Sequence, residues 1–113
     1  MKGALSTHVL DTATGRPAAG VSVSLYRDGA LLAARHTNAD GRTDAPLLVG
    51  DAFTPGTYRI EFAIGDYFAS TGNADAKKFL DVVPIVFVVD APAKGYHVPL
   101  LASPWSYSTY RGS

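Results

Sequence analysis

The segment Val21-Ser22-Val23-Ser24-Leu25-Tyr26-Arg27-Asp28-Gly29 decides the fold class. Its apolar residues recur at every second position, which is the period of a strand that buries one face. Asp28-Gly29 favours a tight hairpin turn into a second strand, Leu31–Thr37. The same alternation returns in Tyr58–Ile64. These segments predict antiparallel strands that turn one face toward a core.

The rest of the chain predicts more short strands and one helix. Further strands are expected at Ile85–Val89, Val98–Ala102 and Trp105–Tyr110. A helix of about two turns is expected over Thr71–Phe79, because Asn73 suits an N-cap and Ala, Asp and Lys follow it. About seven or eight strands with closely spaced turns predict an all-β chain, folded as an antiparallel β-sandwich with one short helix.

Composition limits the classes of function. The 113 residues predict a single domain spanning residues 1–113, and a 47% apolar content predicts a globular one. Ten basic residues balance ten acidic ones. This zero net charge argues against binding to nucleic acid or anionic membranes, and it does little to prevent self-association.

Location and metal content are predicted from what the sequence lacks. Cysteine is absent, so no disulfide, thiolate nucleophile or zinc–thiolate site can form. No apolar stretch reaches membrane-spanning length, and Met1–Val9 lacks the apolar segment of a signal peptide, so a cytoplasmic location is expected. No histidine or carboxylate pair has metal-ligand spacing, so no metal site is expected.

The three histidines are candidates for acid/base chemistry, because imidazole titrates near neutral pH. An ordinary surface or core role is the simplest interpretation of each, and for His36 it is preferred. If Leu5–Leu10 is a strand, His8 shares a face with Ser6, away from the apolar residues. His97 begins the last predicted hairpin. Two imidazoles near an arginine could activate water, with charge repulsion keeping one of them neutral.

Two further features are candidates for substrate contacts. Arg42 follows Asn38-Ala39-Asp40-Gly41, where an exposed turn charge and an anion or carbonyl anchor are both open interpretations. The chain ends on Tyr110-Arg111-Gly112-Ser113, a phenol, a guanidinium, a flexible residue and a hydroxyl beside a terminal carboxylate. Such chemistry predicts a tail that is tied down in a functional site.

These residues lie in motifs that resemble the transthyretin-related proteins acting as 5-hydroxyisourate hydrolases. The resemblance covers essentially the whole chain. The motifs are Leu5–Asp11 with Gly15–Ala18 and Gly20-Val21, Asn38–Arg42 with Pro46–Leu48, and Tyr96–Leu101 with Ser103-Pro104 and Tyr107–Ser113. The terminal Tyr-Arg-Gly-Ser is the motif that separates the hydrolases from the hormone-carrying transthyretins.

The resemblance implies a transthyretin-like sandwich of two four-stranded sheets, assembled as a homotetramer, a dimer of dimers, with active sites at the dimer–dimer interface. It implies hydrolysis of the ring amide of 5-hydroxyisourate, the product of urate oxidation, to 2-oxo-4-hydroxy-4-carboxy-5-ureidoimidazoline, without metal or organic cofactor. A small-ligand carrier of the same fold is the alternative, and a plain structural sandwich of immunoglobulin type is a weaker one.

The resemblance also implies the site residues. The matching catalytic positions are His8, Arg42, His97 and Ser113, and the matching substrate contacts are His8, Arg42, Tyr110 and Ser113. His8 or His97 would activate the water, and the choice between them stays open. Arg42 would bind a substrate oxygen, Tyr110 and Ser113 would hold the ring, and Arg111 would point away.

Overall fold

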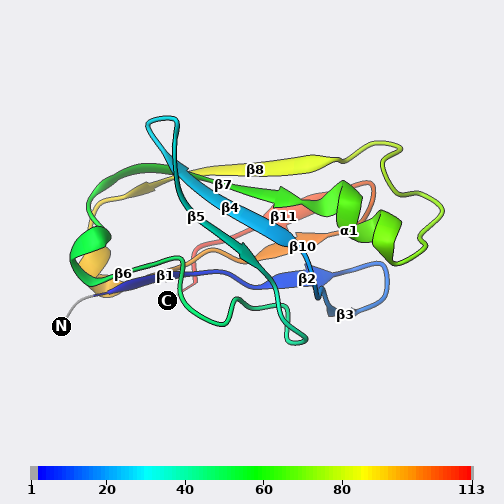
Figure 1. Cartoon of the computed structure of the whole chain (residues 1–113), viewed down its shortest axis with the longest axis horizontal. Coiled ribbons are helices and arrows are strands. Elements are labelled where there is room, and N and C mark those ends of the chain that lie inside the picture. The colour runs from blue at the N-terminus through cyan, green and yellow to red at the C-terminus, as the bar shows by residue number, and fades with distance from the viewer. Residues whose placement is uncertain (1–2, 113) are drawn as a thin grey trace.

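The structure is a computed structural model that describes residues 3–112 and arranges them as two packed layers of β-strands (Figure 1). The first layer is a regular antiparallel sheet with the strand order β5-β4-β7-β8. Its strands are β4 (Ser22–Arg27), β5 (Ala30–His36), β7 (Gly56–Ala63) and β8 (Val82–Val89). The alternating pattern therefore predicted β4 and β7, and the strand expected at Ile85–Val89 is the later part of β8.

The Asp28-Gly29 turn joins β4 to β5 as predicted. Both residues have positive φ, 52° for Asp28 and 79° for Gly29, as a two-residue hairpin turn of the primed type requires. At one edge of the same sheet, β8 contains Pro84. An edge strand tolerates proline because the missing N–H can face away from the ladder.

The second layer is built from much shorter strands and is interrupted halfway along its length. Its strands form two small sheets, β6-β1-β9 and β11-β10-β2-β3. They are β1 (Ala4–Ser6), β2 (Val9–Asp11), β3 (Arg16–Pro17), β6 (Leu48–Val49), β9 (Tyr96–His97), β10 (Leu100–Ala102) and β11 (Tyr107–Thr109). Two 3-10 helices, η1 (Gly50–Ala52) and η2 (Pro92–Lys94), lie in its connections.

The two small sheets continue into each other. β1 leads into β2, β9 leads into β10, and these two segments run parallel. Hydrogen bonds from Val98 N to Ser6 O (2.9 Å) and from Leu100 N to His8 O (2.8 Å) carry the pairing across the interruption. The expected sandwich is thus present, but its second layer has a parallel central pair. Alternation in a sequence defines which face is buried, not the direction of the partner strand.

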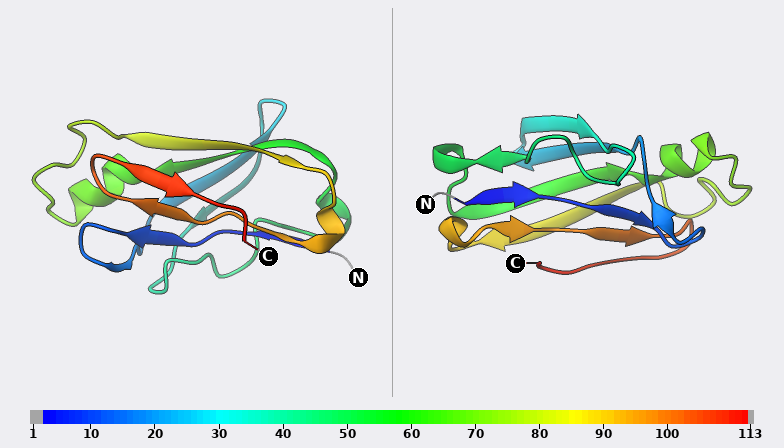
Figure 2. Two further views of the ribbon diagram at one scale, coloured as in Figure 1. Left: turned by 180° about the vertical axis from the view of Figure 1, so that it is seen from behind. Right: turned by 90° about the horizontal axis from the view of Figure 1, so that it is seen from below.

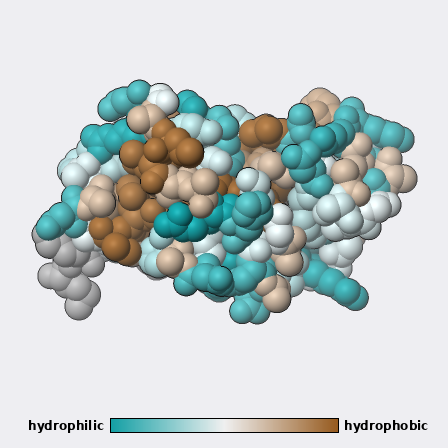
Figure 3. Space-filling view, viewed as in Figure 1, coloured by the Kyte–Doolittle hydropathy of each residue, from teal (hydrophilic) through white to brown (hydrophobic). Residues whose placement is uncertain are grey.

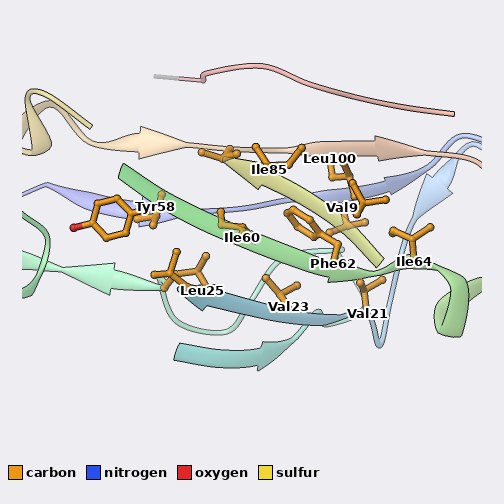
Figure 4. Packing of buried hydrophobic residues seen from close by; sticks show 14 of the residues in the cluster. Val9, Val21, Val23, Leu25, Tyr58, Ile60, Phe62, Ile64, Ile85 and Leu100 are labelled. Atoms are coloured by element: carbon orange, nitrogen blue, oxygen red, sulfur yellow. The ribbon is translucent and has the colours of Figure 1, made fainter. Parts of the chain in front are cut away.

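Side chains from both layers meet in one core. Figure 4 shows residues of β4 and β7, such as Val23 and Phe62, pointing toward Val9 and Leu100 of the second layer. All four are at most 1% exposed. Complete burial of such a side chain stabilises the fold by about 1.5–3 kcal/mol, so this core fixes the orientation of the second layer, where the candidate residues lie.

The helix was predicted at the wrong position. Helix α1 spans Ile64–Ser70, whereas the predicted Thr71–Phe79 segment forms turns. Ile64, Tyr67 and Phe68 are buried, and their i, i+3, i+4 spacing gives α1 an apolar face that the later segment lacks. Asn73 accepts a hydrogen bond from Asp75 N (2.9 Å), which makes a local turn and not a helix cap.

The surface carries a substantial number of apolar side chains. In the space-filling view, hydrophobic residues gather toward one end of the visible face, with hydrophilic residues around them (Figure 3). On edge strand β8, Val82, Val86 and Val88 are more than half exposed. No helix of residues 3–112 has the length and apolar character needed to cross a membrane.

Candidate active site

Strand alternation places two imidazoles on the outer face of the second layer. Leu5, Thr7 and Val9 are buried, at 2% exposure or less, so Ser6 and His8 turn outward. His97 is paired with Ser6 in the β1–β9 register. The ring centroids of His8 and His97 lie 6.5 Å apart, with their planes inclined by 41°. The predicted proximity of these two histidines is therefore present in the structure.

The ring of His97 contacts a neighbouring hydroxyl group, and its surroundings lower its pKa. Its Nδ1 lies 2.8 Å from Ser6 Oγ. Burial lowers the pKa of His97 below its ordinary value, and the positive charges of Arg42 and His8 lower it further. All three causes disfavour the imidazolium form. His97 is therefore a neutral base at physiological pH. Because Nδ1 contacts Ser6, Nε2 is the ring nitrogen available to a substrate or water.

His8 is held by a backbone group. Its Nε2 lies 2.8 Å from the carbonyl oxygen of Asp40. A carbonyl oxygen can only accept a hydrogen bond, so His8 Nε2 is the donor and carries the proton. The unprotonated nitrogen of neutral His8 is then Nδ1. The two imidazoles are thus fastened through different ring nitrogens.

The Asn38–Arg42 turn brings Arg42 to this face. Asn38 Oδ1 accepts hydrogen bonds from Asp40 N (2.9 Å) and Arg42 N (3.2 Å). Gly41 has a φ of 77°, and a Cβ there would overlap the carbonyl oxygen of Val9. The turn can therefore lie against β2, where an antiparallel bridge joins Arg42 to His8. Its side chain remains exposed, free to meet an anion or carbonyl oxygen.

The segment after β11 runs back along the second layer (Figure 2), and an antiparallel bridge joins its Gly112 to His97. Gly112 donates from its backbone N to His97 O at 2.7 Å. A Cβ at Gly112 would lie 3.0 Å from Cβ and Cδ2 of His97, so glycine permits this close approach. Arg111 donates from Nη2 to Gly95 O (3.1 Å), and its Cζ lies 4.3 Å from the centroid of the Tyr96 ring. Arg111 and Gly112 are thus tied down, as predicted for this segment.

The remaining predicted residues have different positions. Arg111 lies against Tyr96, whose side chain is buried, in keeping with the expectation that it points away from the imidazoles. Tyr110 is 59% exposed, two residues before the Gly112–His97 bridge. Ser113 lies outside the described residues. His36 is exposed at the end of β5, in the other layer, so the structure separates it from the pair.

Two groups that hold the imidazoles, Ser6 and the Asp40 carbonyl, were not predicted from the sequence. Ser6 could have been found, because it lies two residues before His8 and shares its strand face. The Asp40 carbonyl had no sequence signal, because any residue supplies one. Among residues 3–112, no group of three or more histidine, cysteine or carboxylate side chains is placed to hold a metal ion.

The site can therefore supply a neutral base, a second imidazole, a guanidinium and a backbone segment held against them. These are the groups needed to activate water and to stabilise negative charge on a carbonyl oxygen. In the chain they come from strand β9, the connection between β1 and β2, the loop after β5 and the segment after β11.

Relatives of the chain carry one recurrent name. A 5-hydroxyisourate hydrolase of Mesorhizobium japonicum is 57% identical, over 98% of this chain and 93% of the relative. The 5-hydroxyisourate hydrolase 2 of Rhizobium meliloti is 52% identical, over 98% of this chain and 97% of the relative. The similarity thus spans nearly the full length of each chain.

Solved structures have the same fold. The Klebsiella pneumoniae 5-hydroxyisourate hydrolase matches with a TM-score of 0.84 and 40% identity, over 98% of this chain and 100% of that one. An (S)-allantoin synthase matches with a TM-score of 0.94 and 46% sequence identity. The match covers 99% of this chain but 44% of that one. Sea bream transthyretin in complex with thyroxine matches with a TM-score of 0.83 and 30% sequence identity. The match covers 96% of this chain and 93% of that one.

The family model described as HIUase/Transthyretin matches residues 5–112. This range includes both site histidines, the Asn38–Arg42 turn and Gly112. With the identity and coverage of the relatives, the match confirms the transthyretin-like sandwich, and the chain belongs to the HIUase/Transthyretin family.

Proposed function

We propose that this protein is a 5-hydroxyisourate hydrolase of urate breakdown. It hydrolyses the ring amide of 5-hydroxyisourate to 2-oxo-4-hydroxy-4-carboxy-5-ureidoimidazoline. The observation that carries the proposal is the pair of imidazoles 6.5 Å apart on one sheet face, beside Arg42. Two relatives of 52% and 57% identity bear the name of this activity.

In the proposed reaction, His97 is the general base. Its lowered pKa keeps the imidazole neutral, so Nε2 can take a proton from water as the water oxygen bonds to the ring carbonyl carbon. The carbon–nitrogen bond then breaks, and the imidazolium returns the proton to the departing ring nitrogen. The ring opens with a new carboxyl group at one end, and no proton is left on the enzyme.

Arg42 stabilises the negative charge that develops during this step, and His8 contacts the substrate. The exposed guanidinium of Arg42 offers a planar pair of donors to the carbonyl oxygen as it becomes an oxyanion. His8, held through Nε2 by the Asp40 carbonyl, can accept a hydrogen bond from a substrate N–H or O–H group at Nδ1. Tyr110 and Ser113 are proposed to hold the ring by hydrogen bonds, because both belong to the segment that Gly112 fastens to His97.

The direct test is an ultraviolet assay of the intermediate. Urate oxidase generates 5-hydroxyisourate, this protein is added, and the decay of the intermediate is followed. We expect decay much faster than the spontaneous rate. Decay at the spontaneous rate, together with saturable binding of a small aromatic ligand, would instead favour the carrier alternative. The polar set formed by His8, His97 and Arg42 argues against a pocket for an apolar hormone.

A homotetramer, formed as a dimer of dimers, is part of the same proposal. Edge strand β8 presents Val82, Val86 and Val88 to solvent, and such an apolar edge is a template for pairing with another chain. The zero net charge opposes association little. Sedimentation equilibrium is expected to give four times the mass of one chain. The proposed cytoplasmic location is tested by cell fractionation.

A further inference from the structure

We propose that Ser6 is a positioning residue, which holds the proton of neutral His97 on Nδ1 and so makes Nε2 the basic nitrogen. The inference deepens the proposed hydrolase function and rests on it. Ser6 contacts the ring of His97 on the side of Nδ1. It is proposed to act on the reaction only through His97.

The backbone places these two residues together independently of their side chains. Ser6 and His97 are partners in the parallel β1–β9 register. Val98 N donates to Ser6 O at 2.9 Å, and Gly112 N donates to His97 O at 2.7 Å. Both residues are therefore fixed by main-chain hydrogen bonds, and the 2.8 Å contact between Oγ and Nδ1 joins two preplaced groups. A half-buried site strengthens such a contact by reducing competition from water.

The direction of this hydrogen bond decides which nitrogen can act as a base. A serine hydroxyl can donate or accept. If Ser6 donated to Nδ1, Nε2 would carry the proton of the neutral ring and would have no lone pair for the water. If Nδ1–H donates to Ser6 Oγ, the lone pair is on Nε2. The same hydrogen bond then persists in the imidazolium, in which both nitrogens are donors.

This arrangement lets His97 gain and lose a proton with no rearrangement of its neighbour. A bond from a charged donor is stronger than one from a neutral donor, so Ser6 stabilises the imidazolium formed during the reaction. His8 has the opposite arrangement, because the Asp40 carbonyl holds its proton on Nε2. The two imidazoles therefore offer different nitrogens to a substrate, Nε2 of His97 and Nδ1 of His8.

The first test observes the proton itself. Nitrogen-15 NMR of the histidine side chains, recorded at a pH where His97 is neutral, distinguishes a protonated ring nitrogen from an unprotonated one. We expect Nδ1 of His97 to be protonated and Nε2 to be unprotonated in the wild-type protein. In Ser6→Ala the ring is expected to become a mixture of both forms. A wild-type spectrum with the proton on Nε2 would overturn the proposal.

The second test measures turnover. Ser6→Ala is expected to lower kcat about 10–100-fold, comparable with the loss of the partners that orient metal-bound histidines, and to leave KM within a few fold. Ser6→Thr keeps the hydroxyl and should restore most of kcat. Ser24→Ala, at a half-buried serine on β4, is the matched control and should leave kcat unchanged. Wild-type kcat in a folded Ser6→Ala protein would refute the role.

The two tests separate this inference from the proposed function. Failure of the wild-type protein to accelerate decay of 5-hydroxyisourate would refute the function, whatever the spectrum shows. An active wild-type protein with its His97 proton on Nε2 would refute the role of Ser6 alone. If Ser6→Ala does not fold, the wild-type spectrum and the Ser6→Thr rates still decide the question.

Discussion

The two layers of this sandwich differ in regularity, and the candidate chemistry lies in the irregular one. The first layer has strands of six to eight residues in antiparallel pairing, with a single register shift between β4 and β5 at Leu25/Tyr26. The second has strands of two or three residues, interrupted near Thr7 and Val98. Thr7 donates its hydroxyl proton to Val98 O at 2.7 Å and satisfies the backbone at this interruption.

The comparison of the two layers shows where a β-sandwich can accommodate a site. In a continuous ladder the backbone groups pair with neighbouring strands, and the side chains alternate strictly between core and solvent. At the interruption of the second layer, the Asn38–Arg42 turn and Gly112 form isolated bridges to His8 and His97. The first layer supplies rigidity, and the second supplies backbone positions at which separate segments converge on two imidazoles.

Removal of the terminal segment should produce the largest effect. Deletion of Tyr110–Ser113 removes Gly112 from His97 and the Arg111 contact with Tyr96. We expect the decay of 5-hydroxyisourate to fall to its spontaneous rate, while circular dichroism still shows the folded sandwich. Full activity of the shortened chain would show that the segment is not part of the site.

Three histidine variants compare the two layers directly. His97→Ala is expected to lower kcat by about two to four orders of magnitude, the range for loss of a general base. The kcat of His8→Ala is expected to decrease by a factor in the same range. His36→Ala, on the exposed end of β5, should leave kcat unchanged. Near-normal turnover in both His8→Ala and His97→Ala would refute the acid/base assignment.

A core variant of the first layer should affect stability and not chemistry. Ile60 is fully buried on β7. Ile60→Ala is expected to lower the free energy of unfolding by about 2–5 kcal/mol, and Ile60→Val by about 0.5–1.5 kcal/mol. Urea denaturation measures both. The kcat of the folded fraction should stay unchanged, and a large fall in kcat for Ile60→Val would contradict the view of this layer as a scaffold.

The smallest predicted effect is a displacement of the pH profile. His97 must be neutral to act as a base, so kcat falls as the pH drops through its pKa. Arg42 is one of the causes that lower this pKa, so wild-type activity should persist below the ordinary histidine pKa. Arg42→Gln removes the charge, raises the pKa of His97 and should move the acidic limb of the kcat profile to higher pH.

Arg35→Gln provides the control for that profile. Arg35 is exposed on β5 and is not among the charges that lower the pKa of His97. Its replacement should leave the acidic limb in place. An acidic limb that does not move in Arg42→Gln would show that the guanidinium does not control the charge state of the base.

The sequence predicted those parts of the fold that depend on local patterns. Alternation in Val21–Arg27 and the Asp28-Gly29 turn were sufficient for the β4–β5 hairpin. Alternation predicted a strand over Tyr58–Ile64, but Ile64 is the first residue of α1 and belongs to its apolar face. A single apolar residue between a strand and a helix fits both periods, and only packing decides between them.

The candidate site shows the same limit. The shared face of Ser6 and His8 followed from period two, and the family motifs implied the proximity of His8, His97 and Arg42. The hydrogen bonds to Ser6 Oγ and to Asp40 O did not follow from the sequence. Each depends on a side-chain orientation and on pairing between segments far apart in the chain.

The order of elements has a consequence for folding of the protein. The whole first layer comes from residues 22–89, whereas the contact between Ser6 and His97 spans 91 positions. Contacts between such distant residues form slowly, because a long loop must close before they gain free energy. The first sheet, whose strands are neighbours in the sequence, is therefore expected to pair before β9 joins β1. Catalytic competence thus arises late, when the last strands join the first.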